Sequence, residues 1–188
     1  YVDGEKTNIL NSTFKINNAT NGAGIYVKGA KTKILNTTFY NNTATDGAGG
    51  FVEGSNTNIS SNSLFKYNDA VNGAGIYVKG TSTEISNTTF DNNTAVNGGG
   101  AYIKGEYTNI LNATFINNNV TYHGGAVYID GSESNIRNNN FTYNEAVPDN
   151  TVSPLSGLGG AIFVRGDNTS TFNNDFEHNK ARNGSAIY

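Results

Sequence analysis

The sequence predicts an all-β fold, a single-stranded parallel β-solenoid of about seven coils of 25–26 residues. Two observations indicate it: a short motif recurs at this period, and several columns of identical residues repeat in phase with it. A period of 20–50 residues is typical of solenoids, propellers and repeat arrays. Asn, Gly and β-branched residues interrupt every helical window, and a propeller blade needs about 40 residues. Three short strands per coil therefore fit the period best.

Each coil is predicted to start with an aromatic, an aliphatic and a charged residue followed by Gly, as in residues 26–29. Alternation along this strand separates two faces, Ala23, Ile25 and Val27 on one and Gly24, Tyr26 and Lys28 on the other. The column of Lys28 contains only charges, so it is expected to face water: Asp3, Lys28, Glu53, Lys79, Lys104, Asp130 and Arg165. The preceding column then faces the core: Val2, Val27, Val52, Val78, Ile103, Ile129 and Val164.

Two further core columns follow along each coil. One contains Ile9, Ile34, Ile59, Ile85, Ile110 and Ile136, and is broken in the last coil by Thr171 and Phe172. The other contains Phe14, Phe39, Phe65, Phe90, Phe115, Phe141 and Phe176. Pairs such as Asn21-Gly22 could mark hairpin turns instead. Only parallel coils, however, explain why identical residues recur: each stacks on its counterpart about 4.8 Å away.

Asn is the most conspicuous residue type, and it falls into two columns. One lies three residues before each Phe (Asn11, Asn36, Asn62, Asn87, Asn112, Asn138 and Asn173), and one lies three residues after it (Asn17, Asn42, Asn68, Asn93, Asn118, Asn144 and Asn179). Asn suits bends, and stacked amides can bond to one another inside a coil. Ladder positions such as Asn11, Asn36, Asn87 and Asn112 are therefore expected to be inaccessible to glycosylation. The candidate glycosylation sites are Asn18, Asn41, Asn92 and Asn168.

The main candidate functional surface is a column of aromatic residues on the face of the charges. It comprises Tyr1, Tyr26, Phe51, Tyr77, Tyr102, Tyr128, Phe163 and Tyr188. A continuous exposed aromatic stripe marks an interaction site, because ring faces stack on sugars and Tyr hydroxyls reach polar partners. The alternative is that the rings cover one another and shield the sheet.

The second candidate is the one break in the period, in the sixth coil, which has 35 residues. Both prolines of the chain lie among the extra residues of this coil, which predicts a loop insertion over residues 147–158. The candidate binding residues of this loop are Pro148, Asp149, Asn150 and Pro154. Insertions in solenoids project from one face, which is often the binding face. A loop without a role in binding is the alternative.

Composition excludes several classes of protein. The absence of Cys rules out a disulfide scaffold and thiolate metal sites, and a net charge of −3 argues against a nucleic-acid partner. No apolar run is long enough for membrane insertion. The acids are scattered, and His123 and His178 have no partner implied by spacing, so we expect surface histidines, no metal, no cofactor and no catalytic residues. With no Met, residues 1–188 are expected to be one solenoid domain from a longer chain.

Two motifs carry a family resemblance: Phe-x-x-Asn in all seven coils, and Gly-Gly-Ala-Val or Gly-Gly-Ala-Ile at residues 124–127 and 159–162. With them the chain resembles the repeats of chlamydial polymorphic outer-membrane proteins. The Asn- and Thr-rich sequence of residues 34–44 resembles that of adhesin-like surface proteins of methanogenic archaea. The resemblance implies a right-handed single-stranded parallel β-helix outside the cell. Unlike the chlamydial proteins, the chain shows no membrane-anchoring barrel.

These observations favour a non-catalytic adhesin on the cell surface that binds a glycan or protein of a host or neighbouring cell. One alternative is a structural protein whose copies assemble end to end through unpaired strand edges. A polysaccharide-active enzyme is a more distant alternative, because β-helices carry such activities. An ice-binding face is equally distant, since Thr7, Thr32, Thr57, Thr83 and Thr108 form only a single file.

Overall fold

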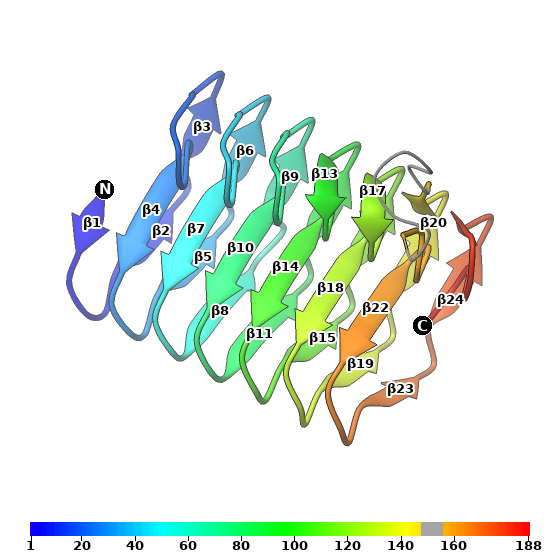
Figure 1. The fold of residues 1–188 in the computed structure, drawn as a ribbon. Helices are drawn as coiled ribbons and strands as arrows, with labels where there is room; N and C mark the ends of the chain where they lie inside the picture. Colours follow the sequence, from blue (N-terminus) through cyan, green and yellow to red (C-terminus); the bar gives the residue numbers. More distant parts are fainter. Residues whose placement is uncertain (148–155) are drawn as a thin grey trace.

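The computed structural model describes residues 1–147 and 156–188, which form one rod of stacked coils (Figure 1). All strand pairs are parallel. The described residues form strands, turns and bends but no helix, and therefore no helix that could cross a membrane. The predicted parallel β-helix is confirmed. Each coil contributes one strand to each of three sheets, A, B and C, and the later coils add a strand to sheet D.

Sheet A contains the strand with the repeated aromatic and charged residues. Its order is β1 (Val2–Asp3), β4 (Ile25–Lys28), β7 (Gly50–Glu53), β10 (Ile76–Lys79), β14 (Ala101–Lys104), β18 (Val127–Asp130) and β22 (Ile162–Arg165). Sheet B follows in each coil. Its order is β2 (Asn8–Leu10), β5 (Lys33–Leu35), β8 (Thr57–Ser60), β11 (Thr83–Ser86), β15 (Asn109–Leu111), β19 (Asn135–Arg137) and β23 (Ser170–Phe172).

Sheet C contains the strand with the repeated Phe. It comprises β3 (Thr13–Lys15), β6 (Thr38–Tyr40), β9 (Leu64–Lys66), β12 (Thr89–Asp91), β16 (Thr114–Ile116), β20 (Asn140–Thr142) and β24 (Asp175–Glu177). Sheet D comprises β13 (Thr94–Asn97), β17 (Asn119–His123), β21 (Glu145–Ala146) and β25 (Lys180–Ala181). In the first three coils single β-bridges, such as Asn18 with Thr43, continue sheet D.

The register places identical residues directly over one another. Tyr26 pairs with Phe51, Ile34 with Ile59, and Phe90 with Phe115. The Val, Ile and Phe columns form the core, and their members are fully buried from the second coil to the sixth. The Phe rings stack almost parallel, with centroids 4.6–5.2 Å apart. The three predicted core columns are confirmed, as is the break at Thr171, after which Phe172 is 69% exposed.

The coil turns at four corners, each made by a residue with positive φ. Three corners carry side chains, as at Lys31, Asn36 and Asn41. The fourth is always Gly, in the column of Gly22, Gly47, Gly73, Gly98, Gly124, Gly159 and Gly184, with φ of 57–67°. A Cβ added to any of them would come within 2.1–2.5 Å of the carbonyl oxygen three residues ahead. Glycine is therefore required at this corner.

The two Asn columns have different roles. The column of Asn93 lies inside the coil, and each side chain from Asn17 to Asn144 donates through Nδ2 to Oδ1 of the Asn in the next coil, at 2.9–3.0 Å. The predicted internal ladder is confirmed here. The column of Asn11 instead forms the corner between sheets B and C, with φ of 46–61°. Asn11, Asn36, Asn87 and Asn112 are exposed, so the prediction that they are inaccessible is wrong.

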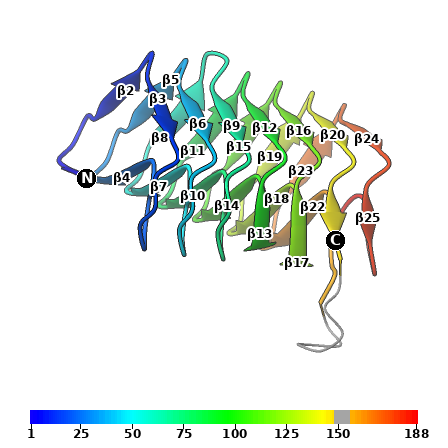
Figure 2. The ribbon, with the colours of Figure 1, turned by 90° about the horizontal axis from the view of Figure 1, so that it is seen from above.

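The segment before sheet A forms a thin ridge that projects from the body of the rod (Figure 2). Its interior is a separate cluster of small side chains, comprising Ala48, Ala70, Ala74, Ala95, Val120 and Ala146 with Ala44 and Ala181 packed against it. Small residues allow the two backbones of the ridge to approach each other closely. We call this feature, residues 43–48 and their counterparts in the other coils, the ridge.

One sequence prediction about side-chain direction is wrong. A Cβ on Gly24 would lie 2.9 Å from Cδ1 of the core residue Phe39, so Gly24 faces inward, because the strand bends beside the ridge and interrupts the alternation. The Thr file also points inward: Thr32, Thr57, Thr83 and Thr108 are at most 1% exposed. Thr7, in the first coil, is half-buried, so the file presents no row of hydroxyls on the surface, which argues against the ice-binding interpretation.

Candidate functional site

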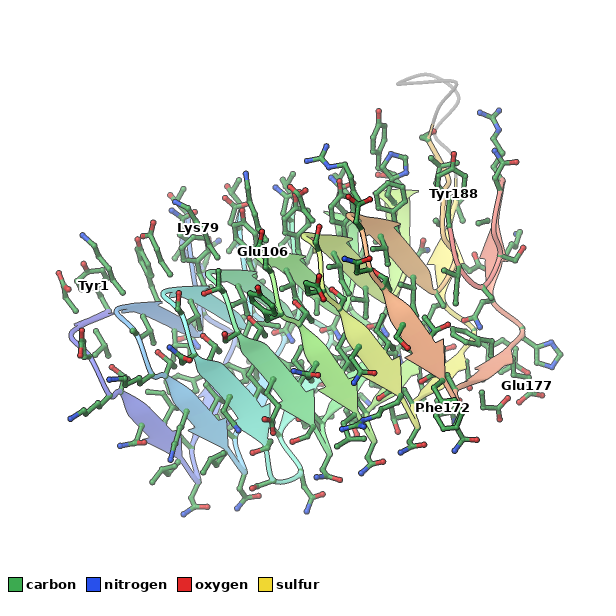
Figure 3. All side chains as sticks on the ribbon, turned by 90° about the horizontal axis from the view of Figure 1, so that it is seen from below. Tyr1, Lys79, Glu106, Phe172, Glu177 and Tyr188 are labelled. Carbon is green, nitrogen blue, oxygen red and sulfur yellow. The ribbon has the colours of Figure 1, made fainter. Side chains whose placement is uncertain are left out.

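The aromatic stripe runs along the outer face of sheet A. Figure 3 shows Tyr1 and Tyr188 at its two ends, with Lys79 on the same side of the rod. The parallel register aligns its members, Tyr1, Tyr26, Phe51, Tyr77, Tyr102, Tyr128, Phe163 and Tyr188, and their centroids lie 4.5–5.7 Å apart. The continuity expected from the sequence is therefore present.

The stripe is less open than the sequence suggests. Tyr1 and Tyr188 are 75% and 53% exposed, but Phe51, Tyr128 and Phe163 are only 7–9% exposed. Tyr26, Tyr77 and Tyr102 are half-buried. The neighbouring rings and the ridge cover the remainder, so three of the eight residues are packing residues. The accessible part of the stripe between its ends consists of Tyr26, Tyr77 and Tyr102.

Ring orientation changes along the stripe. From Tyr1 to Tyr102 successive rings meet edge to face, at interplanar angles of 63–89°. From Tyr102 to Tyr188 they stack, at 4–27°. Both arrangements are favourable and add about 0.5–1.5 kcal/mol per pair beyond the burial of area. The N-terminal half thus turns its rings in alternating directions, whereas the C-terminal half is a closed stack.

The charged column borders the stripe on one side. Lys79 Nζ lies 2.8 Å from Glu53 Oε1, and Arg165 binds Asp130 with two bonds of 3.0 and 2.8 Å. The Tyr26 hydroxyl donates to Glu53 Oε2 at 3.0 Å. Hydrogen bonds from Lys79 and then Tyr26 lower the pKa of Glu53. This border therefore contains two ion pairs, and one of its acids, Glu53, also holds a ring of the stripe.

The ridge borders the stripe on the other side with a column of mostly polar residues. The column contains Asn21, Asp46, Asn72, Asn97, His123, Leu158 and Asn183. Its side chains bond to one another: Asn72 Nδ2 donates to the carboxylate Oδ1 of Asp46 at 2.9 Å, and Asn97 Nδ2 donates to Asn72 Oδ1 at 3.1 Å. The amides and carboxylate of this border are hydrogen-bonding groups that lie along the full length of the accessible tyrosines.

His123 replaces the amide of this column and stacks on Phe163, with centroids 4.7 Å apart at 12°. It is 9% exposed, and its Nδ1 atom is buried without a hydrogen-bond partner. Burial lowers its pKa. The expectation that His123 is a surface residue is wrong, because the sequence did not place the ridge against the stripe. His178 is exposed, stacks on Tyr143 and lies 3.2 Å from Glu177, as expected of a surface residue.

Partial burial also affects the hydroxyl groups of the stripe. Burial is the main reason that the pKa values of Tyr77, Tyr102 and Tyr128 are raised. These hydroxyls therefore stay protonated at neutral pH and can act both as donors and as acceptors. A partner at the accessible part of the stripe would meet apolar ring surface and neutral hydroxyls, with a column of charges on one border and the Asp46 carboxylate among the amides of the other.

The remaining predicted sites are scattered. The loop residues Pro148, Asp149, Asn150 and Pro154 lie outside the described residues. Of the candidate glycosylation sites, Asn18, Asn41 and Asn168 are exposed and Asn92 is half-buried beside Asp91. Glycosylation stays a prediction. Within residues 1–147 and 156–188, no three side chains of His, Asp or Glu are placed to hold a metal ion.

Sequence reasoning missed one feature, a shallow groove along the outer face of sheet B. One hollow of about 460 Å³ is lined by Lys6, Asn8, Lys31, Lys33, Asn56 and Asn58. A second of about 280 Å³ shares Asn56 and Asn58 and is also lined by Thr57, Ser82, Thr83, Glu84, Tyr107 and Asn109. The pattern of lysines two residues apart at 31 and 33, with Lys6 one coil earlier, was the available signal.

Comparison with known families agrees with this architecture. Over residues 1–188 the chain matches the family model described as right handed beta helix region, and the chain belongs to that family. The match establishes the handedness and the fold of the solenoid. Neither a curated protein nor a solved structure matches the chain significantly.

Proposed function

We propose that this chain is a non-catalytic adhesin-like module of a cell-surface protein, and that it binds a glycan through the accessible part of the aromatic stripe. The observation that carries the proposal is the row of half-buried Tyr26, Tyr77 and Tyr102 between two polar borders. Flat rings can stack on the apolar faces of sugars, and the flanking polar groups can bond to sugar hydroxyls.

The rigidity of the site supports this proposal. Each tyrosine lies on a strand that is paired on both sides, and its ring is held by neighbouring rings 4.5–5.0 Å away. Binding would therefore order few side chains, and the loss of conformational entropy on association would be small. A repeat of about 4.8 Å between coils also presents similar groups at regular intervals, which suits a ligand that is itself a linear repeat.

The location is a proposal of the same kind. An attachment module acts outside the cell, where glycans and proteins of a host or neighbouring cell are its partners. The two ion pairs beside the stripe, Glu53 with Lys79 and Asp130 with Arg165, contribute about 0.2–1 kcal/mol each to register. We assign the ion pairs this structural role.

A glycan-array screen of the wild-type protein and a double variant tests the proposal. Tyr77→Ser with Tyr102→Ser removes two accessible rings. Truncation of an anchor residue lowers the binding free energy by more than about 1 kcal/mol, so the loss of two should lower the affinity about thirtyfold. Tyr40→Ser with Tyr67→Ser is the matched control, since these tyrosines are 40% and 44% exposed and also meet edge to face, away from sheet A. Circular dichroism verifies that both variants fold.

Three outcomes would contradict the proposal. The wild-type protein could bind no glycan on the array. The stripe variant could fold and bind as the wild type does. The control variant could lose as much affinity as the stripe variant, which would show that the loss does not depend on the stripe.

A further inference from the structure

The first two coils concentrate positive charge in a chain that is negative overall. The net charge of the 188 residues is −3, yet residues 1–50 contain five of the twelve lysine and arginine residues and only three of the fifteen acidic residues. Three of these five cations, Lys6, Lys31 and Lys33, line the groove of about 460 Å³ on the outer face of sheet B. No acidic residue lines this hollow.

The lysines are stacked as like charges in successive coils, as Lys79 and Lys104 are in sheet A. Lys6 N–H donates to Ala30 O and Lys31 N–H donates to Ser55 O, so the two lysines occupy the same corner of successive coils, about 4.8 Å apart. Lys33 lies on β5 beside them. Like charges on neighbouring strands are destabilising, so this arrangement has a cost for folding.

No intramolecular partner offsets that cost. All three side chains are exposed, and none forms an ion pair with a described residue. Opposite charges in neighbouring coils do pair elsewhere, as in Lys79 with Glu53 and Arg165 with Asp130. Lys28 and Lys104 also lack an ion pair with a described residue, but they line no common hollow. The convergence of three unpaired lysines on one hollow without an acid indicates that they serve an external anion.

The rest of the lining indicates which kind of anion fits. Asn8, Asn56 and Asn58 supply amides that both donate and accept, which suits hydroxyl groups. No aromatic ring lines the lysine-containing hollow, so it offers no platform for stacking nucleic-acid bases. The second hollow continues the groove through Asn56 and Asn58 toward Asn109, so the groove follows the rod axis over several coils.

We propose that this groove binds an anionic polysaccharide that lies along the rod axis, with its acidic groups at Lys6, Lys31 and Lys33. The site is separate from the aromatic stripe, which lies on sheet A. Glu84, whose Oε1 accepts a bond of 3.3 Å from Asn58 Nδ2, limits the anionic part of the ligand to the first coils. The second hollow has no lysine or arginine in its lining, and it adds the exposed ring of Tyr107 to the Asn and Ser side chains and Glu84.

The third coil suggests the variant that tests this site. Asn56 and Asn58 occupy the positions of Lys31 and Lys33 one coil later, and Lys33 pairs with Asn58. Lys31→Asn with Lys33→Asn therefore converts the groove of the second coil into that of the third. Folding is preserved, because Lys31 has φ of 64° and Asn tolerates this conformation well. Lys28→Asn with Lys104→Asn, on the outer face of sheet A, removes the same charge elsewhere.

Binding is measured by titration with polygalacturonate, dextran sulfate, neutral dextran and single-stranded oligothymidylate at two salt concentrations. We expect polygalacturonate, dextran sulfate or both to bind, with an affinity that falls as the salt concentration rises. An exposed charge contact contributes up to about 1 kcal/mol, so the affinity of the groove variant for the anionic polysaccharide should fall about tenfold. The affinity of the control variant should change less than twofold. The Tyr77→Ser, Tyr102→Ser variant should keep this binding, which separates the two sites.

The proposal is overturned if neither anionic polysaccharide binds, if neutral dextran binds equally well, or if the groove variant binds as the wild type does. Equal losses in the groove and control variants would indicate attraction without a site. Tighter binding of oligothymidylate than of both anionic polysaccharides would assign the groove to nucleic acid instead.

Discussion

The buried asparagine ladder gives the sharpest test of what stabilises the rod. Asn93 is fully buried at its centre. Its Nδ2 donates to Asn118 Oδ1 at 3.0 Å and to Phe65 O at 2.9 Å. Its Oδ1 accepts from the backbone N–H of Asn68 at 3.1 Å and from Asn68 Nδ2 at 3.0 Å. Asn93→Ala removes all four bonds at once.

The cost follows from the donors that lose their acceptor. Asn68 is 1% exposed, so its backbone N–H and one proton of Nδ2 are left buried and unpaired. Each unsatisfied buried group costs about 1–3 kcal/mol. We therefore expect Asn93→Ala to lower the free energy of unfolding by about 4 kcal/mol. Asn118 Oδ1 adds little to this cost, because it still accepts from the backbone N–H of residue 93 at 3.1 Å.

Urea denaturation followed by far-ultraviolet circular dichroism measures the change. The matched control is Asn112→Ala, which removes an exposed asparagine from a corner with φ of 50°. Only the preference of Asn for positive φ is lost there, at about 1 kcal/mol. The reasoning is refuted if Asn93→Ala costs less than about 1.5 kcal/mol, or no more than Asn112→Ala.

Three further predictions concern the corners, the core and the ridge. Gly98→Ala should lower the free energy of unfolding by more than about 2 kcal/mol, because φ is 59° and the new Cβ would lie 2.5 Å from a carbonyl oxygen. Gly4→Ala, whose Cβ would have no atom within 4 Å, should be nearly neutral in the same urea assay. Phe90→Ala should lower the free energy of unfolding by about 3–5 kcal/mol, and Phe172→Ala, at a 69% exposed position, by less than about 1 kcal/mol. Similar losses for the two variants would contradict the assignment of Phe90 to the core. Burial lowers the pKa of His123 below its value in the unfolded chain, so the unfolded state takes up the proton first as pH falls. Stability should therefore decline as pH falls from about 6.5 toward the lowered pKa, and His123→Asn should reduce that decline; an unchanged difference in stability between pH 7.5 and pH 5 would refute the assignment.

Much of this fold was predictable because a solenoid repeats its contacts at a fixed sequence distance. A residue 25 or 26 positions away is its neighbour in space, so the columns of Val27, Ile34 and Phe39 identify the core without any knowledge of the corners. The same logic predicted hydrogen bonds between stacked asparagines, which the column of Asn93 forms.

The errors arose where the backbone leaves the extended conformation. Alternation of faces holds only within a strand, and the bend beside the ridge turns Gly24 toward Phe39. The corner column of Asn36 and the internal column of Asn42 share residue type and period, so the sequence could not tell which one is buried. Only the positive φ at Asn36 places its side chain outside.

The sequence by itself determined the class of fold, the coil length, the core columns and the continuity of the aromatic stripe. The tertiary structure decided how much of that stripe is accessible, because coverage depends on the ridge, whose position follows from the Gly corners and the small side chains around Ala74. It also revealed the groove that joins Lys6 to Lys31 and Lys33, since a hollow arises from the path of the corners, which the period of the sequence does not specify.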